Sequence, residues 1–197
     1  PDFDVLKFIV DHGRHLSSWE KDLISIVREE SLYFIPQIKT KIMNEGWASF
    51  WHYKILHELE LSQDLHIPFL KTHNQVIRPH IGRINPYNVG FYIFQKLERE
   101  KGLDFCFFVR SVYNDISFIR EFLDQESMID LNIFSYSKKK DKYTIDEISD
   151  DDGWREAKQA LINNIGMNGM PRIFVDELER SGSLVLEHVH DGRDLDL

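Results

Sequence analysis

The sequence is poor in cysteine, which limits both its covalent cross-links and its location. Only Cys106 is present among 197 residues, so an intramolecular disulfide is excluded. This cysteine stands in the run Phe105-Cys106-Phe107-Phe108 and has no basic neighbour to stabilise a thiolate, which predicts a buried, unreactive thiol. A chain without disulfides is typical of a reducing compartment, and we expect a cytoplasmic protein.

Basic charge and long apolar runs are also scarce. The 24 Lys and Arg residues are outnumbered by 33 Asp and Glu residues, which gives a formal net charge of -9. Such a chain is repelled by phosphate backbones, so we expect no nucleic acid partner. No apolar run reaches the roughly 18 residues of a membrane span, and residues 1–10 lack the basic and apolar regions of a signal peptide. We therefore expect a soluble chain that does not cross a membrane.

The first part of the chain has the periodicity of amphipathic helices. Apolar residues such as Leu23 and Ile26 recur at intervals of three and four, which favours helices over most of residues 4–125. Pro36 has no amide hydrogen, so we expect it to interrupt or bend the helical stretch around it. A helix over residues 37–59 and another over residues 112–124 follow from the same periodicity.

After residue 125 the pattern changes to short alternating segments. Residues 129–136 and 142–148 are typical of two strands around a polar turn, and residues 154–165 of a helix. Two more strands are expected at residues 171–175 and 183–189. We therefore predict an α+β chain with two domains: a mostly helical domain over residues 1–126 and a small mixed α/β module over residues 127–197. The elements of this module follow in the order strand, strand, helix, strand, strand.

The stretch from Lys41 to His52 concentrates polar and aromatic groups within about three helical turns. Glu45 and His52 are seven residues apart, so they project from nearly the same side of a helix with 3.6 residues per turn. Trp47 and Trp51 are four residues apart and share a face. This pattern is unusual for a surface helix and marks a candidate site.

Two interpretations of Glu45 and His52 remain open. The segment Asn44-Glu45-Gly46-Trp47-Ala48 can be compared with the zinc peptidase pattern His-Glu-x-x-His, but Asn44 and Ala48 replace both histidines. Glu45 and His52 could instead supply two ligands of a divalent metal such as zinc, or act in acid/base catalysis, with a third group from elsewhere. The structural interpretation is a buried, hydrogen-bonded pair that orders a helical core.

Several segments together resemble the stage V sporulation protein R (SpoVR) family. Asn44-Glu45-Gly46-Trp47-Ala48 lies in the most specific of them, and the others follow in the order found in that family. The matching segments are residues 33–37, 40–48, 51–52, 84–87 with Gly90, 115–120, 171–175, 184–188 and 192–197. Members of the family are considerably longer, and this chain resembles their C-terminal half. Because it also begins at Pro1 without an initiator Met, we expect a segment of a longer protein.

The resemblance implies a process and leaves the reaction open. It implies a cytoplasmic bacterial protein that, in spore formers, takes part in making the spore cortex, the peptidoglycan layer around the spore core. It supplies no catalytic residue. We expect a scaffold or regulatory protein that binds a protein partner, with the missing N-terminal half of the same polypeptide as a further partner.

Two other functions are open from the sequence, and whether the chain is an enzyme stays undecided. The alternative is a metal-dependent hydrolase distantly related to the zinc peptidases, with Glu45 and His52 in its site. A third hypothesis is a binder of peptidoglycan precursors that stacks a sugar on Trp47 and Trp51, with Asn44 facing the ligand.

Overall fold

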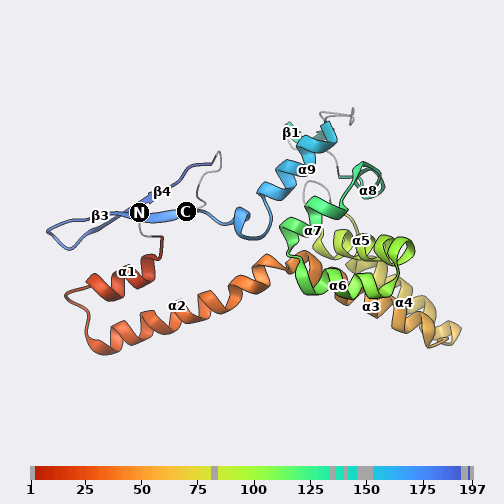
Figure 1. The fold of residues 1–197 in the computed structure, drawn as a ribbon, viewed down its shortest axis with the longest axis horizontal. Helices are drawn as coiled ribbons and strands as arrows, with labels where there is room; N and C mark the ends of the chain where they lie inside the picture. The colour runs from red at the N-terminus through yellow and green to blue at the C-terminus, as the bar shows by residue number, and fades with distance from the viewer. Residues whose placement is uncertain are drawn as a thin grey trace. The chain divides into compact units, whose positions relative to one another are not determined.

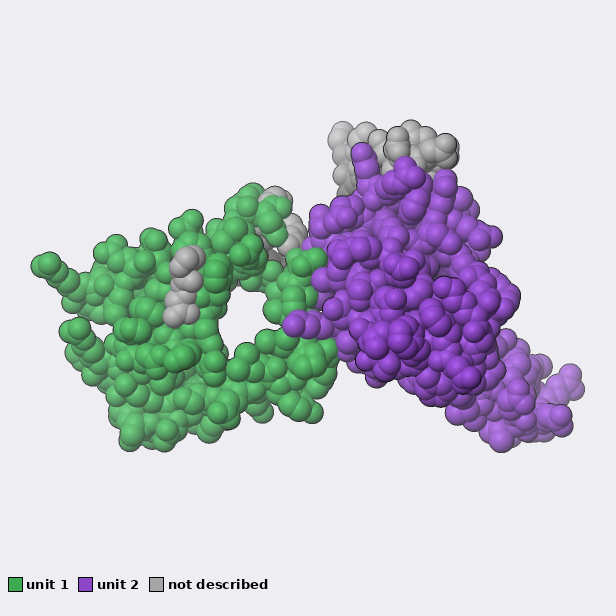
Figure 2. All heavy atoms as spheres, in the orientation of Figure 1, with its two compact units in different colours: residues 1–38, 167–197 green, residues 39–166 purple. Residues whose placement is uncertain are grey.

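A computed structural model describes residues 3–80, 84–133, 136–139, 142–145, 153–191 and 195. The contacts divide the chain into two compact units, which are coloured separately in Figure 2. The smaller unit combines residues 1–38 with residues 167–197, and the larger unit is residues 39–166.

The larger unit is mainly helical (Figure 1). Two segments in it, residues 136–139 and 142–145, pair as an antiparallel hairpin, β1 with β2. Its elements are α3 (Lys41–Glu58), α4 (Gln63–Val76), α5 (Pro86–Lys101), α6 (Leu103–Val112), α7 (Asp115–Phe122), α8 (Gln125–Asp130), β1 (Tyr136–Lys139), β2 (Lys142–Ile145) and α9 (Gly153–Asn163).

Helix α5 forms the centre of the core of this unit. Ile93 and Phe94 of α5 are fully buried, as are Met43 of α3 and Phe118 of α7. Cys106 of α6 is also fully buried, and burial raises the pKa of its thiol to about 11, which confirms the prediction of a buried thiol. The core therefore depends on how closely α3, α6 and α7 can approach α5.

Helices α3 and α5 approach each other at a pair of glycines. A Cβ atom added to Gly46 would overlap the Cα and carbonyl carbon of Gly90, and one added to Gly90 would overlap the carbonyl oxygen of Ile42. The two backbones are thus in direct contact, at a distance that only two residues without side chains permit. Both glycines are needed for this crossing.

The smaller unit is built from two helices and a β-hairpin. Helix α1 contacts β3, and the ring of Phe3 lies edge-on to that of Phe174 at a centroid distance of 5.6 Å. An ion pair of 2.8 Å between Asp4 and Arg28 connects the segment before α1 to α2. The elements are α1 (Val5–His12), α2 (Ser18–Lys39), which ends at the first residue of the larger unit, β3 (Ile173–Leu178) and β4 (Leu184–His188). The short 3-10 helix η1 (Gly166–Gly169) precedes β3 and begins at the last residue of the larger unit.

The predicted fold class and the order of elements in the C-terminal part are confirmed. Helices dominate to residue 130, and β1, β2, α9, β3 and β4 follow in the expected sequence of strand, strand, helix, strand, strand. The proposed domain boundary between residues 126 and 127 falls inside α8, where Ser127 is buried. The division of the chain into domains 1–126 and 127–197 stays a prediction.

Three local predictions differ from the structure. Pro36 does not interrupt α2, which continues through it on an exposed turn where water can satisfy the carbonyl that loses its donor, and a bend at Pro36 stays a prediction. The helix expected over residues 112–124 is shorter, because Asn114 and Ser117 form a reciprocal capping box that starts α7 only at Asp115, while Val112 is the last residue of α6. Ile129, expected in a strand, lies in α8.

None of the helices in the described ranges is both long enough and apolar enough to cross a lipid bilayer.

Replacing Gly46 by alanine tests the glycine crossing. A Gly→Ala exchange in a helix interior normally stabilises a protein by about 1 kcal/mol. At Gly46 we expect the opposite sign, a loss of about 2 kcal/mol in the free energy of unfolding, because the methyl group forces α3 away from α5. Urea denaturation measures this change. The control is Ala48→Gly on the exposed side of α3, which reports helix propensity alone, and a Gly46→Ala protein as stable as the wild type would contradict the crossing.

Candidate functional site

The start of α3 is capped by a residue far away in the sequence. Thr40, the N-cap residue, makes no capping hydrogen bond with its side chain. Instead the amides of Ile42 and Met43 donate to the two carboxyl oxygens of Asp115, at 2.8 and 2.9 Å. Asp115 is the first residue of α7 and is only 1% exposed. A buried carboxylate thus faces the positive end of α3.

The environment of Asp115 shifts its titration. Burial raises the pKa of this carboxyl to about 6, although the hydrogen bonds from the amides of Ile42, Met43 and Lys41 lower it. Strongly shifted pKa values are common at functional sites and also occur in structural networks. Because the two oxygens of Asp115 are engaged by backbone amides, it acts here as a positioning group for α3. Sequence reasoning did not single it out, although it lies in the segment 115–120 that resembles the SpoVR family.

Glu45 faces α5. It is half-buried on α3 and accepts a hydrogen bond from the hydroxyl of Tyr87, in the first turn of α5. This hydrogen bond raises the pKa of Tyr87 above its ordinary value, and burial adds to the shift. Glu45 therefore has the partner that both interpretations of this residue require.

His52 lies against α4. Its ring is edge-on to Phe69 at a centroid distance of 5.4 Å and stacks on His73 at 5.9 Å. Glu45 and His52 share one helix but have different neighbours, and no hydrogen bond or ion pair joins them in the part of the chain that the structure describes. The structural interpretation of a buried, hydrogen-bonded pair is wrong, because His52 is exposed and Glu45 is bonded to Tyr87 instead. The site role of both residues stays a prediction.

Four histidines gather around Phe69 where α3 and α4 pair as an antiparallel hairpin. His57 of α3 lies 5.5 Å from His66 of α4 between ring centroids, and His52 of α3 lies 5.9 Å from His73 of α4. Phe69 contacts all four rings. The spacing along the sequence does not reveal this cluster, because two histidines come from each helix and meet only when the hairpin closes.

His73 is the buried member of this histidine cluster. It is 2% exposed, and its Nε2 atom has no hydrogen-bond partner within the described residues. Burial lowers the pKa of His73, and the positive charges that His52 and His57 can carry lower it further. Both effects favour the neutral form of the His73 imidazole over its protonated form.

The described ranges lack a complete set of metal ligands. They contain no group of three or more His, Cys, Asp or Glu side chains arranged to hold a metal ion. A catalytic zinc usually takes three protein ligands. A centre built on Glu45 and His52 would thus need a ligand from beyond these residues.

The two tryptophans of the motif pack within an aromatic cluster. The ring of Trp47 lies 5.1 Å from that of Phe94 and 5.2 Å from that of Phe107, and Trp51 lies 5.6 Å from Trp47. Both indoles are half-buried. The side-chain nitrogen Nδ2 of Asn44 donates to the hydroxyl of Thr40 at 3.0 Å, and this hydrogen bond supports the first turn of α3. A ligand-facing role for Asn44, Trp47 and Trp51 stays a prediction.

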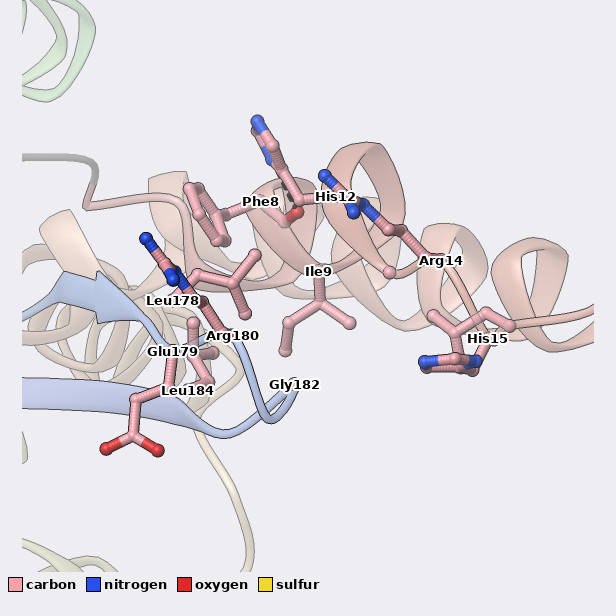
Figure 3. Close-up of a pocket in the computed structure, with 12 residues that line it drawn as sticks. Phe8, Ile9, His12, Arg14, His15, Leu178, Glu179, Arg180, Gly182 and Leu184 are labelled. Atoms are coloured by element: carbon pink, nitrogen blue, oxygen red, sulfur yellow. Dashed lines mark hydrogen bonds between the residues drawn. The ribbon is translucent and has the colours of Figure 1, made fainter.

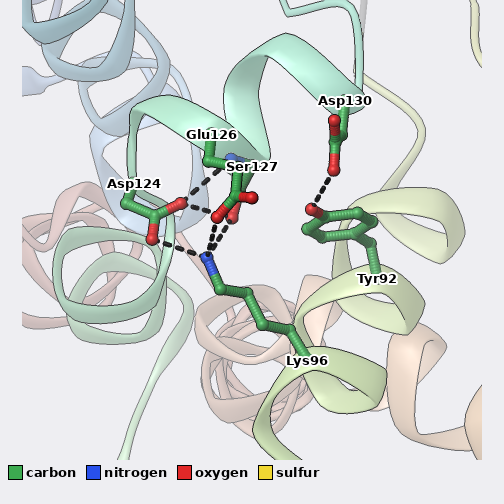
Figure 4. A network of polar contacts seen from close by, with 6 residues as sticks. All are labelled: Tyr92, Lys96, Asp124, Glu126, Ser127 and Asp130. Carbon is green, nitrogen blue, oxygen red and sulfur yellow. Dashed lines mark hydrogen bonds and ion pairs between the residues drawn. The ribbon is translucent and has the colours of Figure 1, made fainter. Parts of the chain in front are cut away.

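A separate polar network connects α5 to α8 (Figure 4). The ammonium group of Lys96 is 2.5 Å from a carboxyl oxygen of Asp124 and 3.2 Å from the hydroxyl of Ser127. Burial raises the pKa of Asp124, but the hydrogen bonds that Asp124 accepts from Lys96 and from the hydroxyl and amide of Ser127 outweigh it and lower the pKa to about 2. Tyr92 donates to Asp130 at 2.6 Å, and burial together with this contact raises the pKa of Tyr92 to about 12. The ion pair of Lys96 and the hydrogen bond of Tyr92 thus stabilise the contact between α5 and α8.

Comparison with known proteins identifies relatives over almost the whole chain. A family model described as SpoVR like protein matches residues 1–170. The uncharacterized protein YcgB of Escherichia coli (strain K12) is 30% identical over 226 residues, an alignment that covers 98% of this chain and 44% of that protein. The chain thus spans less than half the length of this relative. No solved structure matches the chain.

Asp115→Asn tests the buried cap of α3. A folded-state pKa of about 6 lies above the ordinary 3.8, so the folded chain binds this proton more tightly than the unfolded chain does. The contribution of Asp115 to the free energy of unfolding therefore falls as the pH rises from about 4 to about 6. Asparagine offers one acceptor oxygen to two amides, so we expect the variant to lose about 1–3 kcal/mol in its free energy of unfolding. The stability of the variant does not show this pH dependence, because asparagine does not titrate.

Urea denaturation at several pH values and a carboxyl-carbon NMR titration measure both effects. We expect the stability gap between wild type and Asp115→Asn to narrow as the pH rises through this range. The matched control is Asp104→Asn, which changes an exposed carboxyl in the first turn of α6. An Asp115 titration midpoint near 4 would show that burial does not dominate at this carboxyl.

Proposed function

Because the chain belongs to the SpoVR-like protein family, we propose that it acts in bacterial sporulation as a cytoplasmic scaffold or regulatory protein of spore cortex formation. The resemblance of the motif segments to the SpoVR family supports the process. The observation that carries the molecular role is an uncovered apolar face on α2, which suits the binding of a protein partner.

The apolar face of α2 consists of Trp19, Leu23, Ile26, Val27 and Phe34, which we call the α2 stripe. These residues are spaced by three, four and seven positions, so they lie on one side of the helix. Each is between 49% and 62% exposed. The opposite side of α2 carries the half-buried residues of the helix, so the apolar stripe faces away from its own unit.

An exposed stripe of this size has an energetic consequence. Covering a large apolar side chain stabilises a complex by about 1.5–3 kcal/mol when burial is complete, and the α2 stripe has five such side chains. Contiguous exposed apolar patches are typical of protein interaction sites. We propose that a second protein covers the α2 stripe with the apolar face of an amphipathic helix, laid against it.

The charges beside the α2 stripe define the partner further. Glu30 lies within the stripe, and Asp22 and Glu29 follow one of its edges, all three exposed. Opposite charges at the rim of an interface guide association and fix its register. The proposed partner helix accordingly carries Lys or Arg residues beside its apolar face.

Glutamine substitutions in the α2 stripe test this proposal. In the full-length protein, expressed in a spore-forming host, we expect a photo-cross-linking amino acid at position 27 to capture a second polypeptide. Leu23→Gln with Ile26→Gln reduces this capture at least tenfold, because buried apolar contacts worth more than about 1.4 kcal/mol are lost. The matched control is Leu32→Gln, which changes a leucine 44% exposed on another side of α2. Adducts within the same chain only would show that another part of the protein covers the stripe, and would contradict the scaffold.

The alternative function, a metal-dependent hydrolase, rests on Glu45 and His52. One observation favours keeping it: His52 stacks on His73 at 5.9 Å, so a second imidazole lies near the proposed ligand. If a further ligand comes from the longer family protein, that protein binds about one metal ion per chain. Glu45→Gln and His52→Ala then both lose the ion, because each removes a ligand.

Elemental analysis of the purified full-length protein measures the bound metal. His80→Ala, which removes an exposed histidine outside the histidine cluster, is the control and retains the metal. A protein without metal in every form, or one whose metal content is unchanged in both variants, would eliminate the hydrolase.

A further inference from the structure

The smaller unit contains a cavity that the proposed partner binding does not use. It lies between α1, the turn that follows α1, and the hairpin β3–β4, and has a volume of about 670 Å³ (Figure 3). Sites for small molecules in proteins usually enclose about 300–1,000 Å³. The lining residues and the α2 stripe have no member in common.

The floor of the cavity is apolar and comes from three segments. Phe8 and Ile9 belong to α1, Leu16 to the following turn, and Leu178 and Leu184 to the hairpin. Leu178 and Leu184 are partners in the β3–β4 register, so they lie opposite each other at the end of the hairpin. Figure 3 shows Ile9 projecting from α1 toward the hairpin turn at Gly182. These side chains form an apolar surface with room for an alkyl chain.

The turn between α1 and α2 is packed closely against this floor. A Cβ atom added to Gly13 would lie 2.6 Å from Cδ1 of Leu16 and 2.6 Å from the carbonyl oxygen of Ile9. Leu16 is thus held against the end of α1, where it forms part of the floor.

The rim of the cavity is basic, in contrast to the acidic chain as a whole. Arg14 and Arg180 carry permanent positive charges, Arg14 from the turn after α1 and Arg180 from the hairpin, and His12 and His15 also line the cavity. Neither arginine side chain has an ion pair or hydrogen bond with another residue in the described ranges. The one acidic lining residue, Glu179, already accepts a hydrogen bond of 2.9 Å from the hydroxyl of Ser181. Two arginines against this one carboxylate leave the rim with a net positive charge, so it can accept an anion.

We propose that this cavity binds a free amphiphile with one alkyl chain and one anionic head group, of the fatty acid class. The alkyl chain lies on the floor formed by the leucines, Phe8 and Ile9. The carboxylate lies at the rim beside Arg14 and Arg180, where charge-assisted hydrogen bonds are stronger than neutral ones. The cavity volume, the apolar floor and the two available guanidinium groups together select this class.

Calorimetric titration of the chain with dodecanoate, below its micelle-forming concentration, tests the proposal. We expect saturable binding of one dodecanoate per chain, with NMR shifts concentrated at Ile9 and Leu184. Dodecanol, which has the same chain and no charge, binds about tenfold more weakly. Octanoate is also weaker than dodecanoate, by roughly fourfold for each methylene group that is fully buried.

Two sets of variants separate the rim from the floor. Arg14→Gln with Arg180→Gln lowers the affinity for dodecanoate to that for dodecanol and leaves dodecanol binding unchanged. Ile9→Asn weakens both ligands. Arg99→Gln, an equal loss of charge at an exposed residue of α5, leaves both affinities unchanged. Circular dichroism and thermal unfolding verify that each variant is folded. If Ile9→Asn does not fold, the double variant Arg14→Gln with Arg180→Gln still tests the proposal, because it leaves the apolar floor unchanged.

Three results would overturn the proposal. These are the absence of saturable dodecanoate binding, equal affinity for dodecanoate and dodecanol, and binding to phosphatidylglycerol vesicles alone. The double variant Leu23→Gln with Ile26→Gln retains dodecanoate binding, because its residues are outside the cavity. A failure of the cavity proposal is thereby distinguished from a failure of the partner proposal.

Discussion

The direct backbone contact between Gly46 and Gly90 is the constraint on which the larger unit depends. It sets the distance between α3 and α5, and the neighbouring side chains follow from it. One residue before Gly46, Glu45 reaches Tyr87 at the start of α5, and one residue after it, Trp47 packs on Phe94. The motif that marks the sequence is therefore first of all the place where two helices touch. The contact between α3 and α5 also fixes the positions of the polar groups of the motif, so that Glu45 lies against α5 and His52 against α4.

The fold class and the order of the elements could be predicted from the sequence because they are recorded in local periodicity. What could not be predicted depends on contacts between distant residues. The cap of α3 by Asp115 joins residues 72 and 73 positions apart, and no pattern within either helix indicates it. The division between α6 and α7 depends on a capping box at Asn114 and Ser117, which competes with a periodicity that continues across it.

The candidate site was predicted in part, for the same reason. Helical spacing correctly placed Trp47 and Trp51 on one face of α3, where their rings pack together. It could not show that His52 meets His73, because they are brought together by the hairpin of α3 and α4. On α2, periodicity predicted an amphipathic helix but could not say whether its apolar side is covered. In the structure, Leu23 and Ile26 are both more than half exposed.

The cap of α3 also has a consequence for how the larger unit opens and closes. Two amides at the beginning of α3 lose their acceptor whenever α7 detaches, and the carboxyl of Asp115 then regains water. Fluctuations of the two segments are coupled in this way, although more than seventy residues separate them. We therefore expect the first turn of α3 and the whole of α7 to open as one cooperative unit, with amide protons that exchange with solvent together.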